Sequence, residues 1–212
     1  VVKFGSGNGM SVDGALSAAG TADAPIRFTS VRDDAEWDTN GDGADTQPAV
    51  GDWNSIQFNE GSSGTLDHCI IEYTGYSNET AILVRGDAYP VISNCTIGPG
   101  RDGVHVYDTA APSLIGNRAV DLIWPVRIGT WSAGLGTMEG NTLQNVQNPG
   151  IRLDDPSVPA DQTRTWQAHP DGLPYAIGSW VTVDAGASLT IEPGVVVKFG
   201  SGNGMSVDGA LS

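Results

Sequence analysis

An acidic stretch near the N-terminus contains the residue types of a metal-binding loop. Residues 38–43 read DTNGDG, in which Asp38, Asn40 and Asp42 alternate with small residues and a glycine follows the last carboxylate. Closely spaced carboxylate and amide oxygens can surround a hard cation, and glycine permits the sharp turn that such a loop requires. We predict a Ca²⁺ site here, with Asp34 and Asp45 completing the ligand set.

The remainder of this stretch departs from the helix–loop–helix calcium motif. The twelfth position, where that motif has a bidentate glutamate, is Ala49, and no helical pattern flanks the loop. Further carboxylates nearby could replace it, namely Asp33, Glu36 and Asp52. The alternative to a cation site is a solvated acidic loop between two strands.

Three short apolar segments carry a basic residue at the same position. The segments are GVHV, PVRI and GIRL, and the basic residues are His105, Arg127 and Arg152. On one face of a sheet they would form a strip that could hold an acidic polysaccharide. Cleavage of that polymer by a lyase needs an Arg or Lys to remove a proton and calcium to neutralise the carboxylate. We expect no carboxylate pair on the strands beside the two arginines. The alternative is that they pair with single carboxylates, namely Asp154, Asp155 or Asp121.

These side chains lie in elements that repeat along the chain. Short alternating strands contain apolar residues spaced 26, 22, 22 and 25 positions apart, namely Ile56, Ile82, Val104, Val126 and Ile151. A second set follows these strands, spaced 26, 23 and 24 positions apart: His68, Asn94, Asn117 and Asn141. Two interleaved sets with one period predict a parallel β-solenoid, in which equivalent strands stack about 4.8 Å apart.

Stacked coils bring equivalent residues into columns. The apolar residues are predicted to form aliphatic ladders in the core, and the second set is predicted to form a turn ladder in which Asn side chains bond to the backbone. Cys69 and Cys95 hold equivalent positions in adjacent coils, so their Cα atoms should lie about 5 Å apart, within disulfide range. Both a disulfide bond and two stacked thiols are compatible with this spacing.

One segment occurs twice. Residues 1–17 and 196–212 both read VVKFGSGNGMSVDGALS, which gives a period of 195 residues. We interpret the chain as one repeat unit plus a 17-residue overlap, the alternative being an artificial duplication. At about 24 residues per coil, one unit has about eight coils and an axial length of about 40 Å. The expected divisions are coils at 1–153 with an acidic loop insertion at 32–52, a connecting loop at 154–178, and coils at 179–212 that start the next repeat.

Composition supports an all-β chain and excludes two classes of partner. The 29 glycines and 12 prolines separate short apolar runs, which is typical of many tight turns. The net charge of −15 repels nucleic acid and favours divalent cations. No run of 18 apolar residues occurs, so we expect no membrane insertion.

Several segments resemble a known family. The runs SWVTVDAGASLTIEPGVVVKFG, APIRFTSVRDD, DTNGDG, GDWNSIQF and GTLDHCIIEYTG are similar to secreted bacterial right-handed parallel β-helix repeat proteins of the pectin-lyase-like superfamily. The resemblance covers nearly the whole chain. It implies a right-handed parallel β-helix, an architecture that serves lyases, adhesins and passive stalks alike, so it implies no single function.

The repeat predicts a structural role for the chain, not an enzymatic one. An uncapped solenoid end presents unpaired strand edges that pair with another chain, and here the last strands are identical to the first. We therefore expect a unit of an extracellular or cell-surface filament, stalk or adhesin-like fibre, whose partners are adjacent units joined head to tail. The alternative is a polysaccharide-binding or polysaccharide-lyase-like module acting through the Arg127 and Arg152 face.

Overall fold

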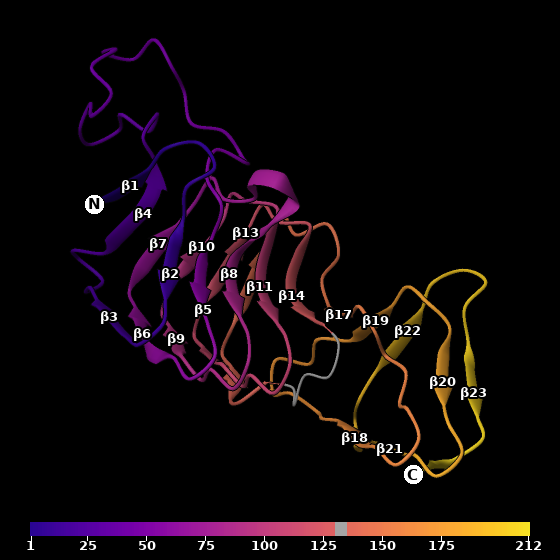
Figure 1. The fold of residues 1–212 in the computed structure, drawn as a ribbon. Helices are drawn as coiled ribbons and strands as arrows, with labels where there is room; N and C mark the ends of the chain where they lie inside the picture. Colours follow the sequence, from indigo (N-terminus) through magenta and orange to yellow (C-terminus); the bar gives the residue numbers. More distant parts are fainter. Residues whose placement is uncertain (130–134) are drawn as a thin grey trace.

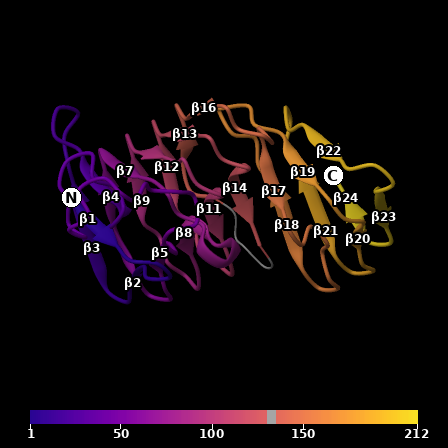
Figure 2. The ribbon, with the colours of Figure 1, turned by 90° about the horizontal axis from the view of Figure 1, so that it is seen from above.

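The computed structural model describes residues 1–129 and 135–212, and in this part of the chain the strands form an elongated parallel β-solenoid (Figures 1 and 2). Coils stack along one axis from the N-terminal to the C-terminal end, so each strand pairs with its counterpart about one coil away in the sequence. The all-β parallel solenoid of about eight turns predicted from the period is confirmed. Within the described residues, no helix is long and apolar enough to cross a membrane.

Three sheets run along most of the solenoid. The six-stranded sheet contains β1 (Val2–Phe4), β4 (Ile26–Ser30), β7 (Cys69–Ile71), β10 (Thr96–Ile97), β13 (Arg118–Val120) and β16 (Thr142–Gln144). The eight-stranded sheet contains β2 (Met10–Val12), β5 (Ile56–Phe58), β8 (Thr80–Val84), β11 (Asp102–Val106), β14 (Trp124–Ile128), β17 (Ile151–Leu153), β19 (Tyr175–Ile177) and β22 (Val197–Phe199). The five-stranded sheet contains β3 (Ala15–Ala19), β6 (Ser63–Asp67), β9 (Val91–Ser93), β12 (Ser113–Ile115) and β15 (Met138–Glu139).

Two smaller sheets complete the coils near the C-terminus. The three-stranded sheet contains β18 (Thr163–Trp166), β21 (Ser188–Ile191) and β24 (Ala210–Leu211), and the two-stranded sheet contains β20 (Val181–Val183) and β23 (Met205–Val207). A short 3₁₀ turn, η1 (Tyr76–Asn78), precedes β8. Residues 154–178 were predicted to be a connecting loop, but β18 and β19 lie within this range and pair with strands of the coils around them.

The predicted aliphatic ladder forms the core of the eight-stranded sheet. Strand pairing places Ile56, Ile82, Val104, Val126 and Ile151 in one column, and all five are buried. Alternate residues of a strand point to the same face, so the residues two positions further along the strands form a second buried column. This column is made of Phe58, Val84, Val106, Ile128 and Leu153.

The four residues predicted to form one turn ladder lie in two adjacent columns. Strand pairing stacks His68 on Asn94, and one position further along the chain it stacks Asn117 on Asn141. The prediction was wrong because the residues were aligned by their polar type, whereas the register is set by the pairing of β10 with β13. Asn117 therefore stacks on Cys95 and not on Asn94.

The column of Asn117 is a chain of hydrogen bonds that runs along the solenoid. The backbone N–H of Cys95 donates to Oδ1 of Asn117 at 3.0 Å, and the N–H of Asn117 donates to Oδ1 of Asn141 at 2.9 Å. The N–H of Asn141 donates in turn to the carboxylate of Asp171 at 3.2 Å. Nδ2 of Asn117 also donates to the carbonyl of Ile92 at 2.8 Å. Each side chain thus satisfies backbone groups at a tight corner, and Asp171 is a member that the sequence did not predict.

The column of His68 and Asn94 turns the chain. Both residues adopt a left-handed conformation, with φ of 48° and 51°, and Gly116 and Gly140 occupy the same column in the next two coils with φ of 64° and 69°. Left-handed backbone is least costly for glycine and is better tolerated by asparagine than by most residues. The corner therefore depends on backbone conformation, while the neighbouring Asn117 column depends on side-chain hydrogen bonds.

Asp67 links the residues of this corner and gives it a pH dependence. Its carboxylate accepts hydrogen bonds from Ser93 at 2.7 Å and from Asn94 at 2.8 Å, and it contacts His68 at 2.9 Å. These bonds lower the pKa of Asp67 from 3.8 to about 2. A carboxyl group with a lowered pKa in the folded state adds stability above its unfolded pKa and loses it as the pH falls towards the folded value.

We expect the contribution of Asp67 to the free energy of unfolding to be constant above about pH 5 and to decline between about pH 5 and pH 2. Urea unfolding of the wild-type protein and of Asp67→Asn at several pH values measures it as the difference between the two curves. A difference that does not change over this range would contradict the assignment.

Candidate functional sites: an acidic loop and a paired basic face

The acidic loop projects from the N-terminal end of the solenoid, between β4 and β5 (Figure 1). One carboxylate oxygen from each of Asp34, Asp38 and Asp42 lies within 4.8 Å of the others. The turn that brings them together is held by the Asp38 carboxylate, which accepts hydrogen bonds from the N–H groups of Gly41 at 2.6 Å and Gly43 at 2.9 Å. Both glycines have positive φ, at 78° and 74°, as the predicted sharp turn requires.

The other two predicted ligands lie differently. The amide of Asn40 is used within the loop: Nδ2 donates to Asp42 at 3.0 Å, and Oδ1 accepts from the N–H of Asp42 at 3.3 Å. Asp45 is exposed, and its carboxylate is not part of the three-carboxylate group. The structure therefore brings together three of the five residues that were predicted to hold the cation.

The charges of the loop suit a hard cation. Burial and the charges of Asp38 and Asp42 raise the pKa of Asp34, whereas the N–H groups of Gly43 and Gly41 lower the pKa of Asp38. Both oxygens of Asp34 and Oδ1 of Asp42 are buried without a hydrogen-bond partner. Three close carboxylates repel one another, and a divalent cation bound by oxygen ligands would relieve that repulsion.

We expect the wild-type protein to bind Ca²⁺ at these three carboxylates and Asp34→Asn to bind it at least about tenfold more weakly, because the substitution removes one of three charged ligands. Asp45→Asn makes the same change of charge in the same loop but outside the group, so it should bind Ca²⁺ like the wild-type protein. Isothermal titration calorimetry with CaCl₂ measures both. Equal losses in the two variants would show that the loop attracts cations only through its overall charge.

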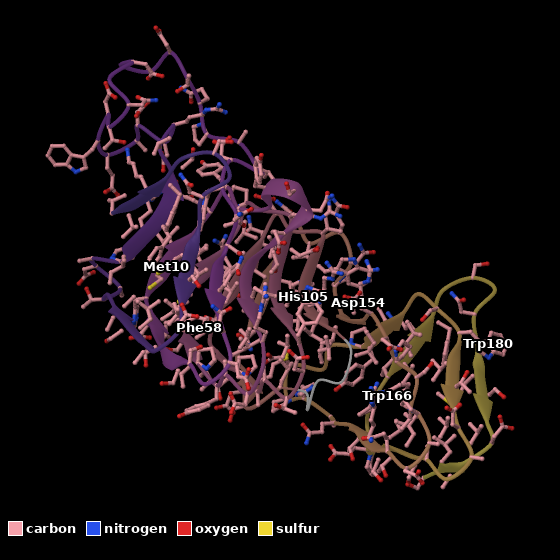
Figure 3. The ribbon with its side chains drawn as sticks, viewed as in Figure 1. Met10, Phe58, His105, Asp154, Trp166 and Trp180 are labelled. Carbon is pink, nitrogen blue, oxygen red and sulfur yellow. The ribbon has the colours of Figure 1, made fainter. Side chains whose placement is uncertain are left out.

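The predicted basic strip exists, and each of its residues contacts a carboxylate. Strand pairing aligns His105 with Arg127 and Arg127 with Arg152. All three converge on Asp154, which contacts His105 Nε2 at 3.1 Å, Arg127 Nη2 at 2.7 Å and Arg152 Nε at 2.7 Å. Figure 3 shows His105 and Asp154 on the same side of the solenoid. Of the candidate carboxylates, Asp154 is the partner.

The expectation that no pair of carboxylates lies beside the arginines is wrong, because a second carboxylate contacts Arg127. Asp102, at the start of β11, contacts Arg127 Nη1 at 3.0 Å, so Arg127 lies between Asp102 and Asp154. Asp154 was foreseeable as a neighbour of Arg152, because residues two apart on a strand share a face. Asp102 was not, because it lies in a neighbouring coil and reaches Arg127 only through the length of the guanidinium side chain.

This arrangement gives Arg127 a structural role. Burial alone would lower its pKa, but the carboxylates of Asp154 and Asp102 outweigh burial and raise the pKa above its ordinary value. Burial would raise the pKa of Asp154, yet the hydrogen bond from His105 and the charge of Arg127 lower it. An arginine held in its charged form by two carboxylates is poorly suited to remove a proton from a substrate.

Arg152 is the most exposed member of this cluster and borders a hollow. Its guanidinium carbon lies 5.7 Å from the centre of the Trp124 ring. A surface hollow of about 410 Å³ lies beside them, and Lys198 and Phe199 form part of its lining. An aromatic ring with two cationic side chains can contact a sugar ring that carries a carboxylate.

Cys69 and Cys95 are free, buried thiols stacked in adjacent coils. The N–H of Cys69 donates to Sγ of Cys95 at 3.4 Å, which makes the pair the start of the Asn117 hydrogen-bond column. Of the two arrangements that the spacing allowed, the structure has the stacked thiols and not the disulfide bond. The side-chain contact with the Cys69 thiol, together with burial, raises the pKa of Cys95 although the backbone N–H of Cys69 lowers it, and the raised pKa disfavours a reactive thiolate.

The comparison with known families agrees with this architecture. The model of a family described as right handed beta helix region matches residues 51–163, which is a little more than half of the chain. The protein therefore belongs to the right-handed β-helix family. No curated protein and no solved structure matches the chain.

Proposed function

We propose that this protein is the repeating unit of an extracellular filament, stalk or adhesin-like surface fibre, and that it has no enzymatic role. The observation that carries the proposal is that residues 1–17 and 196–212 are identical and form outermost strands at opposite ends of the solenoid. Open parallel edges favour pairing with further strands. Because the first and last segments of each unit have the same sequence, the sheets can continue from one unit into the next.

The acidic surface and the loop fit this role outside the cell. The net charge of −15 keeps neighbouring fibres apart by repulsion. Extracellular calcium, bound by Asp34, Asp38 and Asp42, would stiffen the projecting loop. Both features depend on ionic conditions, so calcium and salt are expected to control the stiffness and spacing of the fibres.

We expect electron microscopy of the concentrated protein to show filaments with an axial repeat near 40 Å, or a small multiple of it, since about eight coils stack about 4.8 Å apart. Removal of calcium with a chelator should reduce the order of the filaments without dissolving them, because the loop lies outside the stacked sheets. Discrete particles at all concentrations would contradict the proposed function.

The hollow beside Trp124 favours one second candidate, a module that binds an acidic polysaccharide. Arg152 and Lys198 would contact carboxylates, and Trp124 would contact the sugar ring. Discrete particles that bind polygalacturonate but not a neutral glucan would support this candidate over the filament. A lyase reaction is less well supported, because both carboxylates beside Arg127 already pair with it.

A further inference from the structure

The two copies of the repeated segment use opposite edges of the same strands. In the first copy, β1, β2 and β3 pair with β4, β5 and β6, which follow them in the chain. In the second copy, β22, β23 and β24 pair with β19, β20 and β21, which precede them. A strand in a parallel sheet can pair on both edges at once, so one copy of this segment can hold both sets of neighbours.

Identical residues differ between the two copies in how much of each side chain is exposed. Phe4 is 9% exposed and Val12 is 7% exposed, whereas their counterparts Phe199 and Val207 are 38% and 39% exposed. Phe4 stacks on the fully buried ring of Trp53, with the ring centres 4.3 Å apart. The apolar side chains of residues 196–212 are thus left partly uncovered at the edge where the first copy is covered.

Polar contacts at the covered edge are specific to this sequence. Asn54 donates to the carbonyl of Gly7 at 2.9 Å, and Asn59 donates to Ser11 at 2.9 Å and to Asp13 at 2.8 Å. The second copy carries the same groups at the equivalent positions, namely Gly202, Ser206 and Asp208. The edge formed by β4, β5 and β6 therefore fits residues 196–212 as well as it fits residues 1–17.

We propose that residues 196–212 of one chain pair with β4, β5 and β6 of a second copy of this chain, in the register of residues 1–17, which they displace. The inference rests on the proposed filament and specifies its joint as a strand exchange. Because the two segments are identical, the incoming segment restores every interaction that the displaced segment made with the second chain. The coverage that Phe199 and Val207 gain equals the coverage that Phe4 and Val12 of the displaced segment lose. The net favourable terms are therefore the conformational freedom that the released residues 1–17 regain and the removal of the open strand edge of residues 196–212.

The exchange also fixes how the sheets meet. Residues 197–199 end the eight-stranded sheet, whereas the same residues of the first copy, 2–4, begin the six-stranded sheet. At the joint, the eight-stranded sheet of one chain continues into the six-stranded sheet of the next. Direct stacking of one chain end on the other, without displacement, would instead place β22 against β1.

Two single-cysteine variants test the register. Ser11 pairs with Gln57 in the first copy, and Ser206 is the counterpart of Ser11. Paired parallel strands lie about 4.8 Å apart, within the range for a disulfide bond. Chains carrying Ser206→Cys and chains carrying Gln57→Cys are mixed, assembled and oxidised, and we expect a covalent dimer on non-reducing gels that reducing agent separates. The wild-type chain controls for its own buried cysteines.

The possible results distinguish the proposed strand exchange from the proposed filament function. A dimer between Ser206→Cys and Ser11→Cys, in place of the one with Gln57→Cys, would overturn the exchange in favour of direct stacking. Filaments in the microscope with neither cross-link would also overturn the exchange and leave the proposed function standing. Chains that stay monomeric and form no cross-link would overturn both. A chain with Ser11→Cys and Gln57→Cys together should form an internal disulfide, which confirms that the pair can be oxidised.

Discussion

Replacement of Arg127 by alanine is expected to lower the free energy of unfolding by about 3–5 kcal/mol, because it breaks a buried ion pair and leaves its partner charged. The partner is Asp102, whose side chain is only 3% exposed. Without Arg127, the nearest remaining cation is Arg101, whose Nε lies 3.9 Å from the Asp102 carboxylate. Urea unfolding followed by circular dichroism measures the loss.

Arg152→Ala is the matched control for this prediction. Arg152 also contacts Asp154, but its side chain is 42% exposed, and an exposed ion pair contributes about 1 kcal/mol or less. The same substitution at two adjacent positions of one column thus separates a buried pair from an exposed one. Equal losses of unfolding free energy in the two variants would show that Arg127 does not stabilise the buried carboxylate of Asp102.

Replacement of Asn117 by alanine is expected to cost about 2–4 kcal/mol, since each buried group that loses its partner costs about 1–3 kcal/mol. The change leaves the N–H of Cys95 and the carbonyl of Ile92 without the side chain that bonds to them. It also breaks the hydrogen-bond column between coils. Hydrogen exchange should show faster opening of the Cys95 amide than of amides in distant coils.

Asn94→Gly tests whether the column of His68 and Asn94 depends on backbone conformation and not on side-chain hydrogen bonds. Asn94 is exposed and left-handed, and glycine already occupies this column at Gly116 and Gly140. Glycine relieves the backbone cost while the hydrogen bond to Asp67 is lost, so the net change should be within about 1 kcal/mol. If Asn94→Gly lowered the free energy of unfolding as much as Asn117→Ala, the Asn94 column would also depend on side-chain hydrogen bonds, contrary to this prediction.

The period of the apolar residues was sufficient to predict the fold. Inward-facing side chains must repeat once per coil, so the spacing of Ile82, Val104 and Val126 reports the coil length directly. The turn residues carried less information, because histidine and asparagine suit several positions of a corner. Aligning the apolar residues Ile71, Ile97 and Ala119 instead would have placed Asn117 in the column of Cys95.

The candidate sites were predicted less completely, for reasons that differ between residues. The DTNGDG spacing was sufficient to place Asp38 near Asp42, because both belong to one tight turn. Asp102 and Asp171 reach their partners across coils, through side-chain length and an irregular segment, and no local spacing reports such contacts. Contacts within a turn or along a column are readable from sequence, whereas contacts set by side-chain reach are not.

The change of sheet at the proposed joint has a consequence for the outline of the filament. The acidic loop leaves the solenoid after β4, in the sheet that begins with β1. If each joint moves that sheet by one position around the cross-section, successive loops emerge from successive sides and follow a screw path along the axis. In such a filament the loops project on every side, so they would prevent two filaments from packing closely side by side. We therefore expect single fibres and not bundles or ribbons.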